Sequence, residues 1–243
     1  TYGLTINAMN ITVGDDEIIT VEVPDNVDDV VIWVNGTKYR NTSFSDNKAT
    51  FNVTGLKEGI YTVTATVNDT EFEPINFTTI FTVSKTYPSI NITVVNETSI
   101  YVNDTVKVIV TVPSDATEDV TIEINGMEFT NSTVNGNATF YIPEITFGNK
   151  TVVATYPGDD KYRFNSTTAN FTVNKRQSQV NVTVDAGLVG DDTVINVTIP
   201  ANATGYVIVN VDGTNYTVNT TNGNGSITIK GLGSTTHTVH VTY

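Results

Sequence analysis

A strand followed by a two-residue turn recurs three times along the chain, and this stretch decides the fold. It reads Val31-Ile32-Trp33-Val34-Asn35-Gly36-Thr37, then Thr121-Ile122-Glu123-Ile124-Asn125-Gly126-Met127, then Ile208-Val209-Asn210-Val211-Asp212-Gly213-Thr214. Asn-Gly and Asp-Gly favour the tight hairpin turn, because both turn residues must adopt positive φ. Each stretch is therefore predicted to form a β-hairpin.

The length of the turn also predicts the register of the first hairpin. A two-residue loop places Trp33 opposite Lys38 and Ile32 opposite Tyr39. Successive side chains of a strand point to opposite faces of the sheet. Ile32 and Tyr39 are thus predicted to face the core, whereas Trp33 and Lys38 face outward.

Further landmarks repeat on both sides of the hairpin. Alternating apolar runs end at Pro24, Pro113 and Pro200, which lie 89 and 87 residues apart. Downstream, residues 61–67 correspond to 150–156 and to 237–243. A recurrence of several landmarks at one period is the signature of internal repeats. We predict three homologous domains, at residues 1–86, 87–176 and 177–243.

Each copy is predicted to be all-β. Its segments are short, alternate with period two and are rich in Val, Ile, Thr, Tyr and Phe. About seven such strands in roughly 90 residues fit a two-sheet sandwich of the immunoglobulin-like kind. The fold prediction is thus three tandem immunoglobulin-like β-sandwich domains in an elongated array.

The third copy stops at Tyr243, whereas the second continues past the matching Tyr156 into a further strand at 169–173. We therefore predict that the third copy is truncated before its last strand and exposes a sheet edge. The limits of the fragment are the expected cause. Donation of a strand by another chain is the alternative.

Composition excludes some classes of partner. The chain carries 26 acidic and 12 basic residues, for a net charge of -14. Nucleic acids and anionic lipids are recognised by clustered Lys and Arg, so neither is an expected partner. No apolar run is long enough to span a bilayer.

The absence of cysteine points to a prokaryotic surface protein or an intracellular one. If the chain is secreted, its export signal and anchor are expected outside this fragment.

One stretch carries a family resemblance. The sequence Ala154-Thr-Tyr-Pro-Gly-Asp-Asp-Lys-Tyr162, followed by Asn165-Ser-Thr and a closing strand, resembles the repeat signature of bacterial Ig-like domains of group 3. The resemblance covers 88–173 and is weaker in the first copy. Such repeats are stacked in adhesin-like surface proteins of methanogenic archaea and of some bacteria. The resemblance implies an extracellular, cell-surface location. Members of the family serve as adhesive tips, stalks or spacers.

The functional prediction follows from this resemblance. We expect a non-catalytic, adhesin-like segment that acts as a stalk or adhesive repeat in cell–cell or cell–surface attachment. Its expected partners are other cells, surface glycans or surface proteins, with no insertion of this fragment into the membrane. The alternative is a carbohydrate- or protein-binding module that uses Trp33, beside Lys38, as an exposed aromatic platform. A Trp33–Lys38 cation–π pair that only covers its own sheet is the simpler interpretation.

Acidic turns are candidates for a structural calcium site, and no other cofactor is expected. Ca²⁺ takes six to eight oxygen ligands, which a junction between domains could gather from two turns. Ordinary solvated turns are the competing interpretation. The candidate ligands are Asp15, Asp16, Asp104, Asp159, Asp160, Asp191 and Asp192.

Asn-x-Thr sequences on predicted strands are candidate glycosylation sites. Alternation places the Asn and the Thr on the outer face, where an oligosaccharide can be attached. A β protein that uses Asn and Thr as surface residues also generates this motif by composition alone. The candidates are Asn91, Asn170, Asn181 and Asn196.

Catalysis is not predicted. The two histidines, His237 and His240, are three residues apart on a predicted strand and so face opposite sides. Glu123 and Glu128 form a carboxylate pair, but on a flat exposed sheet where nothing raises a pKa for acid–base chemistry. The chain is therefore expected not to be an enzyme.

Overall fold

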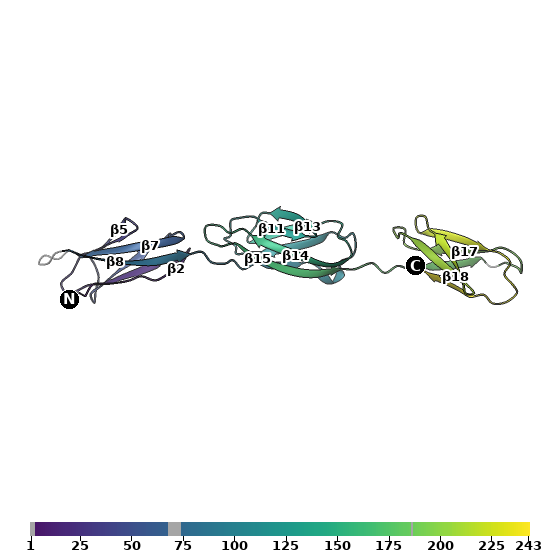
Figure 1. Ribbon diagram of the computed structural model, residues 1–243, viewed down its shortest axis with the longest axis horizontal. Helices are drawn as coiled ribbons and strands as arrows, with labels where there is room; N and C mark the ends of the chain where they lie inside the picture. The colour runs from purple at the N-terminus through teal and green to yellow at the C-terminus, as the bar shows by residue number, and fades with distance from the viewer. Residues whose placement is uncertain (1–2, 68–73, 186) are drawn as a thin grey trace. The chain divides into compact units, whose positions relative to one another are not determined.

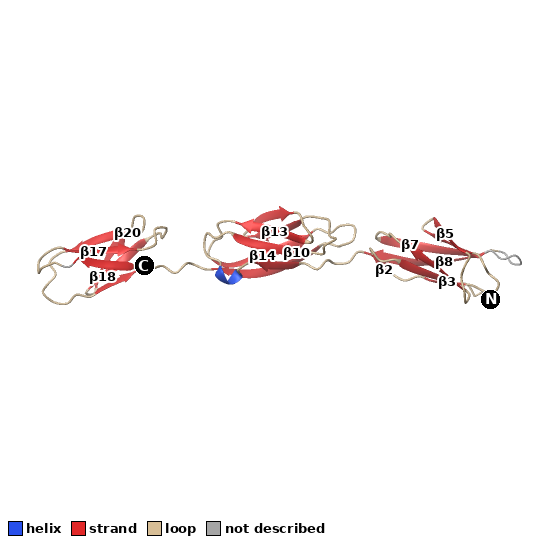
Figure 2. Ribbon diagram, turned by 180° about the vertical axis from the view of Figure 1, so that it is seen from behind, coloured by secondary structure: helices blue, strands red, loops and turns tan. Residues whose placement is uncertain are grey.

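The computed structural model describes residues 3–67, 74–185 and 187–243. Nearly all of the regular structure in these residues is β-strand, with one short 3₁₀ helix, η1, at Glu97–Ser99 (Figure 2). The chain divides into two compact units, Thr1–Asn174 and Lys175–Tyr243. The first unit contains two of the sequence repeats and the second unit contains the third.

Repeat 1 opens the first unit. Its strands are β1 (Thr5–Asn7), β2 (Ile11–Thr12), β3 (Glu17–Glu22), β4 (Val30–Val34), β5 (Thr37–Asn41), β6 (Lys48–Val53), β7 (Gly59–Val67) and β8 (Ile75–Ser84). As far as this repeat is described, they form two sheets, β1-β3-β6 and β2-β8-β7-β4-β5 (Figure 1). β2 runs parallel to β8, and the other neighbours are antiparallel.

Repeat 2 has the same plan. Its strands are β9 (Asn91–Val94), β10 (Val106–Thr111), β11 (Val120–Ile124), β12 (Met127–Asn131), β13 (Asn137–Ile142), β14 (Gly148–Tyr156) and β15 (Asn165–Val173). One sheet has the order β13-β10-β9 and the other β12-β11-β14-β15. A parallel bridge between Tyr101 and Asn174 takes the place of the β2–β8 pair of repeat 1.

Repeat 3 forms the second unit. Its strands are β16 (Asn181–Asp185), β17 (Thr193–Thr198), β18 (Tyr206–Val211), β19 (Thr214–Asn219), β20 (Asn224–Ile229) and β21 (Val239–Thr242). The sheets have the orders β16-β17-β20 and β19-β18-β21. β21 corresponds to β14, and within the described residues of this unit no strand corresponds to β15.

Buried aliphatic and aromatic side chains form a separate core in each repeat of the described chain. Strict alternation produces these cores, as in β4, where Ile32 and Val34 are buried and Trp33 is exposed. The hairpin register is confirmed, since Trp33 pairs with Lys38 and Ile32 with Tyr39.

The prediction of an all-β chain of tandem immunoglobulin-like sandwiches is confirmed. Each sandwich buries the inner faces of its two sheets against one another. The residue boundaries of the three domains, and the elongation of the array, stay predictions.

Candidate functional site: the loop beside the first interrepeat linker

Residues 156–164, here called the junction loop, connect β14 to β15 in repeat 2. Tyr156, the last residue of β14, is fully buried. After it the chain turns at Gly158, which has φ of 92°. A Cβ at this position would lie 2.9 Å from the Tyr162 carbonyl oxygen and from the Phe164 nitrogen. Only glycine combines that backbone conformation with so close an approach.

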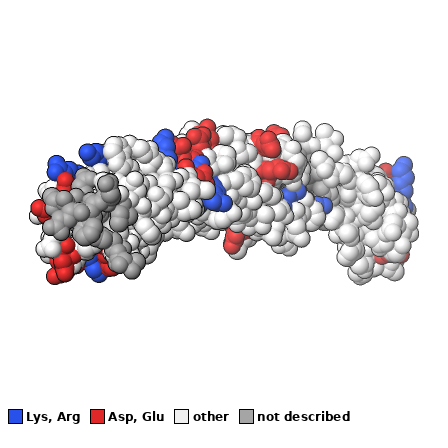
Figure 3. Space-filling model, turned by 60° about the vertical axis from the view of Figure 1, so that its left-hand side comes forward, with Lys and Arg blue, Asp and Glu red and all other residues white. Residues whose placement is uncertain are grey.

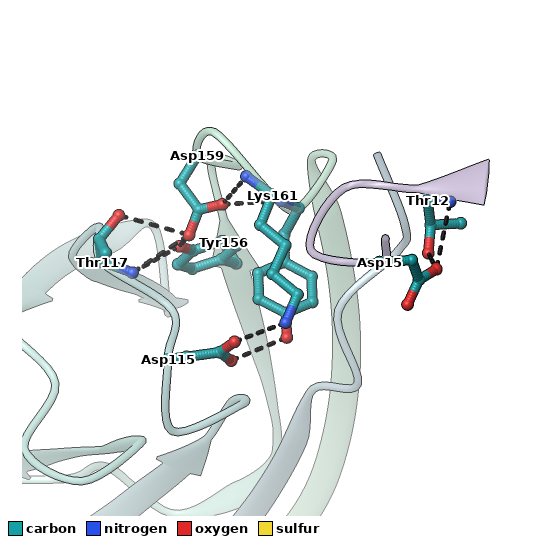
Figure 4. Close-up of polar contacts among 8 residues, drawn as sticks. Thr12, Asp15, Asp115, Thr117, Tyr156, Asp159 and Lys161 are labelled. Atoms are coloured by element: carbon teal, nitrogen blue, oxygen red, sulfur yellow. Dashed lines mark hydrogen bonds and ion pairs between the residues drawn. The ribbon is translucent and has the colours of Figure 1, made fainter. Parts of the chain in front are cut away.

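The carboxylate of Asp159 lies at the centre of the loop (Figure 4). One oxygen accepts hydrogen bonds from the Tyr156 hydroxyl at 2.5 Å and from the Thr117 backbone N–H at 3.1 Å. The other oxygen accepts bonds from the backbone N–H groups of Lys161 and Tyr162, each at 2.7 Å. One side chain therefore ties the loop both to its own turn and to residues about forty positions upstream.

These bonds stabilise the ionised form of Asp159. Partial burial, the largest single influence, raises the pKa of this carboxyl group. The hydrogen bonds from Tyr156 and from the backbone of Tyr162, Thr117 and Lys161 act together in the opposite direction and lower the pKa to about 2. An anion held by donors on both oxygens is a structural group rather than a proton carrier near neutral pH.

Asp115 is a second carboxylate that binds side chains of the junction loop. It accepts hydrogen bonds from the ammonium of Lys161 at 2.6 Å and from the hydroxyl of Tyr162 at 2.8 Å. The hydrogen bonds from Lys161 and then Tyr162 lower the pKa of Asp115. The loop is thus fixed at two points to the segment that precedes β11.

The linker that follows β8 is hydrogen-bonded along the fixed loop. The N–H of Thr86 donates to the Lys161 carbonyl at 3.2 Å, and the N–H of Arg163 donates to the Thr86 carbonyl at 2.7 Å. The Arg163 guanidinium donates to the Lys85 carbonyl at 3.1 Å, and the Asn165 amide donates to the Pro88 carbonyl at 2.9 Å. Residues 85–88 are therefore held by main-chain and side-chain bonds rather than left as a free tether.

Charged side chains of repeat 1 also approach the loop. Glu58 lies 3.9 Å from Lys85 and 3.7 Å from Arg163, and Lys57 lies 3.4 Å from Asp160. The Lys57–Asp160 pair is exposed and the two Glu58 pairs are partly exposed at distances near 4 Å, so each contributes little to stability. They border an open hollow of about 750 Å³ that Glu58 and Lys85 line together with the junction loop.

The Gly14–Asp15 turn of repeat 1 lies beside Lys161. A Cβ on Gly14 would lie 3.4 Å from the Lys161 Cε. Asp15 accepts a 2.6 Å hydrogen bond from the Thr12 hydroxyl, and this bond is the main cause that lowers its pKa. Carboxylates from both repeats therefore lie near this linker.

The acidic turns are not gathered into a metal site in the described part of the chain. There, no group of three or more His, Cys, Asp or Glu side chains is placed to hold a metal ion. The candidate ligands instead bond to neighbours within their own repeats or across the linker. Asp16 accepts from Asn52, Asp104 from Tyr101, Asp191 from Leu188, and Asp192 lies 4.0 Å from Lys230. We therefore do not propose a calcium site.

Trp33 and Lys38 lie side by side on the outer face of repeat 1. The Trp33 side chain is 41% exposed, and the Lys38 ammonium is 5.8 Å from its ring centroid. This geometry is that of a cation–π pair. Whether the pair binds a ligand stays a prediction.

The candidate glycosylation residues differ in their accessibility. Asn91, Asn170 and Asn181 are exposed, although the side-chain oxygen of Asn170 accepts a 2.7 Å hydrogen bond from Thr151. Asn196 is only partly exposed. Glycosylation of any of them stays a prediction.

The placement of His237 on a strand was wrong, because β21 begins at Val239. His237 precedes the strand and its Nδ1 lies 2.5 Å from the Asp212 carboxylate. Asp212 belongs to the predicted hairpin turn, whose position opposite His237 the strand periodicity alone does not reveal. The two histidines are therefore not two members of one alternating strand.

The face drawn in Figure 3 is mostly uncharged, with acidic and basic side chains in small separate groups. No broad basic surface of the kind that binds nucleic acid is seen on it. The described residues contain no helix with the length and hydrophobicity needed to cross a membrane.

Comparisons with known proteins give weak similarity. No protein-family model matches the chain, and no curated protein matches it. The fibronectin(III)-like modules of CbhA from Clostridium thermocellum share 19% identity, with 71% of this chain and 94% of that chain covered and a TM-score of 0.32. A putative membrane-anchored protein from Corynebacterium diphtheriae shares 13% identity, with 98% and 82% covered and a TM-score of 0.39. At these scores the similarity supports no conclusion about activity or ligand.

Proposed function

We propose that this chain is a non-catalytic spacer in a cell-surface, adhesin-like protein, built from repeats of the bacterial Ig-like group 3 type. Its role is to carry an adhesive part away from the surface of a cell, such as that of a methanogenic archaeon. The partners at the far end are other cells, surface glycans or surface proteins.

The observation that carries the proposal is the hydrogen bonding of Thr86 on both of its backbone groups by the junction loop. A binding module needs an accessible platform or cleft, whereas a spacer needs successive repeats whose connections resist bending. Asp159 and Asp115 fix the loop, and the loop in turn bonds the linker. This polar network thus serves a connection between repeats.

The same network supports a non-catalytic role. Both oxygens of Asp159, whose pKa is lowered to about 2, already accept hydrogen bonds within the loop. A general base must be free to reach a substrate proton. Asp159 and its neighbours therefore stabilise the loop and are not proposed to act in catalysis.

Binding of the labelled, multimerised chain to microbial cells, host cells and polysaccharides tests the spacer role. We expect no saturable binding that unlabelled chain competes away. Saturable, competed binding to one target would contradict a pure spacer and favour an adhesive repeat.

A second candidate function is a carbohydrate- or protein-binding module centred on Trp33. The observation that favours it is the exposure of an indole ring beside a cation. Aromatic side chains stack on sugar rings and anchor protein interfaces. If binding is found in the panel, its loss in Trp33→Ala and its retention in Tyr206→Ala, at another exposed aromatic, would establish this alternative.

A further inference from the structure

In repeats 1 and 2 an early segment of the repeat is bonded, in the parallel direction, to the end of its last strand. In repeat 1, β2 is parallel to β8, and the N–H of Val13 donates to the Ser84 carbonyl at 3.0 Å. In repeat 2 the N–H of Val102 donates to the Asn174 carbonyl, and the N–H of Asn174 donates to the Ile100 carbonyl, both at 2.9 Å. Each of these repeats is therefore tied between its own early segment and its last strand.

An aspartate turn holds the early segment of repeat 2 in place. The Asp104 carboxylate accepts a hydrogen bond from the Tyr101 N–H at 2.8 Å, and the Asp104 N–H donates to the Tyr101 carbonyl at 3.0 Å. Tyr101 is thus bonded to Asp104, while the two residues beside it are bonded to Asn174. We call residues 100–104 together with Asn174 the parallel clamp of repeat 2.

The same turn recurs at the equivalent position of each repeat. Asp15 accepts from the N–H and the hydroxyl of Thr12, at 3.3 and 2.6 Å, and its own N–H donates to the Thr12 carbonyl (Figure 4). Asp191 makes the corresponding pair of backbone bonds with Leu188. The three aspartates lie 89 and 87 residues apart, the same spacing as the prolines. A turn that recurs at the repeat period indicates a role in the architecture that the repeats share.

The chain enters and leaves repeat 2 at opposite ends of β15. It enters at Pro88, whose carbonyl accepts a 2.9 Å bond from the side chain of Asn165, the first residue of β15. It leaves at Asn174, directly after the last residue of that strand. A strand of nine residues spans about 30 Å. A pull on both ends of the repeat therefore acts along β15.

Parallel pairing determines how such a pull loads the hydrogen bonds. β15 is pulled toward its own C-terminal end, whereas residues 100–102, which run in the same direction, are pulled back toward Pro88. The two segments must slide past one another, so the bonds of the parallel clamp are stretched together rather than one after another. Load from Pro88 reaches the clamp through β9, which is itself held by four residue pairs with β10. On its other side β15 is paired with β14 along its whole length.

We propose that repeats 1 and 2 are load-bearing modules, in which the parallel bonds between the early segment and the last strand set the resistance to a pull along the chain. Asp15 and Asp104 are positioning residues that keep the early segment aligned for these bonds. Load bearing rests on the proposed spacer role, because a spacer that joins a cell to its target transmits tension. These acidic turns thereby receive a function that needs no metal ion.

The test stretches repeat 2 within the full chain by optical tweezers. Handles are attached to cysteines introduced at two exposed positions, Tyr87→Cys and Gln177→Cys. A second geometry, with Tyr87→Cys and Phe164→Cys, pulls from one end of β15 only, so that the strands separate bond by bond. At the same loading rate, the first geometry is expected to need at least about twofold more force to unfold the repeat. Equal forces in the two geometries would overturn the proposal.

Variants of repeat 2 test the aspartate turn in the first geometry. Asp104→Ala removes the carboxylate that accepts the Tyr101 N–H, and at a fixed force the repeat should unfold at least about fivefold faster. Gly126→Ala is the matched control, because it strains the β11–β12 turn at φ of 74° without altering the parallel clamp. It should lower the melting temperature but leave the unfolding rate under force nearly unchanged. Equal unfolding rates of the two variants would contradict load bearing by the clamp.

The second geometry separates the clamp from a general loss of stability. There Asp104→Ala should unfold at the same force as the chain that retains Asp104, because the strand ends beside Pro88 separate first. An equal loss of force in both geometries would rule out the clamp.

These forces do not depend on any binding partner. Saturable binding of the chain to a target would contradict the spacer role, whereas equal forces in the two pulling geometries would contradict load bearing. The two failures are therefore distinguishable.

Discussion

At the scale of single residues, the short side chain of Asp159 explains why an aspartate occupies the centre of the junction loop. Its carboxylate reaches the N–H groups two and three residues ahead, at Lys161 and Tyr162, as aspartates at the start of turns commonly do. The buried Tyr156 hydroxyl and the Thr117 backbone complete the set of donors. A longer Glu side chain would not fit this arrangement without moving the loop.

The pKa of Asp159 predicts how the stability of repeat 2 depends on pH. Because its pKa of about 2 lies below the ordinary 3.8, ionisation stabilises the fold above the ordinary value. This contribution is lost as pH falls toward 2. We expect Asp159→Asn to lower the free energy of unfolding by about 1–2 kcal/mol at neutral pH. The free energy of unfolding of this variant should also fall less steeply as the pH is lowered toward 2. Hydrogen exchange of β14 and β15 amides measures this.

The exposed neighbour Asp160 provides the control for this prediction. Its side chain is 88% exposed and pairs only loosely with Lys57. Asp160→Asn should leave both the stability and its pH dependence nearly unchanged. An equal effect of the two substitutions would show that charge in this region, not the hydrogen bonds of Asp159, sets the stability.

His237 is predicted to titrate above its ordinary value. The hydrogen bond to Asp212 is the main cause that raises the pKa of His237. The pair therefore stabilises repeat 3 at pH values below the ordinary 6.5, and this contribution is lost as pH rises through the folded-state pKa. In an NMR titration, Asp212→Asn should move the His237 pKa down toward 6.5, and an unchanged pKa would exclude the pairing.

At the scale of elements, the junction loop depends on one glycine for its turn. Gly158 combines φ of 92° with contacts that a Cβ would place at 2.9 Å. We expect Gly158→Ala to destabilise repeat 2 by about 2–4 kcal/mol, from backbone strain together with the steric clash. Differential scanning calorimetry of the full chain measures the loss.

Gly126 separates the two causes. It also has positive φ, 74°, but nothing lies within 4 Å of its would-be Cβ. Gly126→Ala should therefore cost only about 1–2 kcal/mol, the strain alone. If both variants lost the same stability, close packing around Gly158 would not matter.

The elements also show how far sequence reasoning reaches. Alternation and the Asn-Gly turn predict the first hairpin and its register, because both depend on residues that are neighbours along the chain. Asp159 was predicted only as a candidate metal ligand, although its spacing to Lys161 and Tyr162 is typical of a turn. Asp115 and Thr117 lie over forty residues from their partners, and no local pattern reports such contacts.

At the scale of the whole molecule, the described repeats share a plan of two sheets around a separate core. In the first two repeats the core includes side chains of the last strand, Phe81 and Val83 of β8 and Phe171 and Val173 of β15. In repeat 3, Ile195, Val197 and Val209 are fully or almost fully buried in a core of their own.

The connection between repeats 1 and 2 is the feature on which the spacer role depends. The linker bonds at Thr86 and Arg163 are expected to hold the two sandwiches in one arrangement. Exposed ion pairs such as Lys57–Asp160 are expected to add little. Because the chain contains no cysteine, cysteines for spin labels can be introduced at chosen positions without first replacing native ones.

The most direct measurement is therefore the distance distribution between spin labels at Ile18→Cys and Tyr141→Cys, two exposed positions in repeats 1 and 2, by pulsed electron paramagnetic resonance. The account predicts one narrow distribution. It broadens when Thr86→Pro removes the N–H that bonds the Lys161 carbonyl and Arg163→Ala removes the guanidinium that bonds the Lys85 carbonyl, and it stays narrow in Lys57→Ala. A broad distribution in the otherwise unchanged chain, or an unchanged width after loss of these two hydrogen bonds, would contradict it.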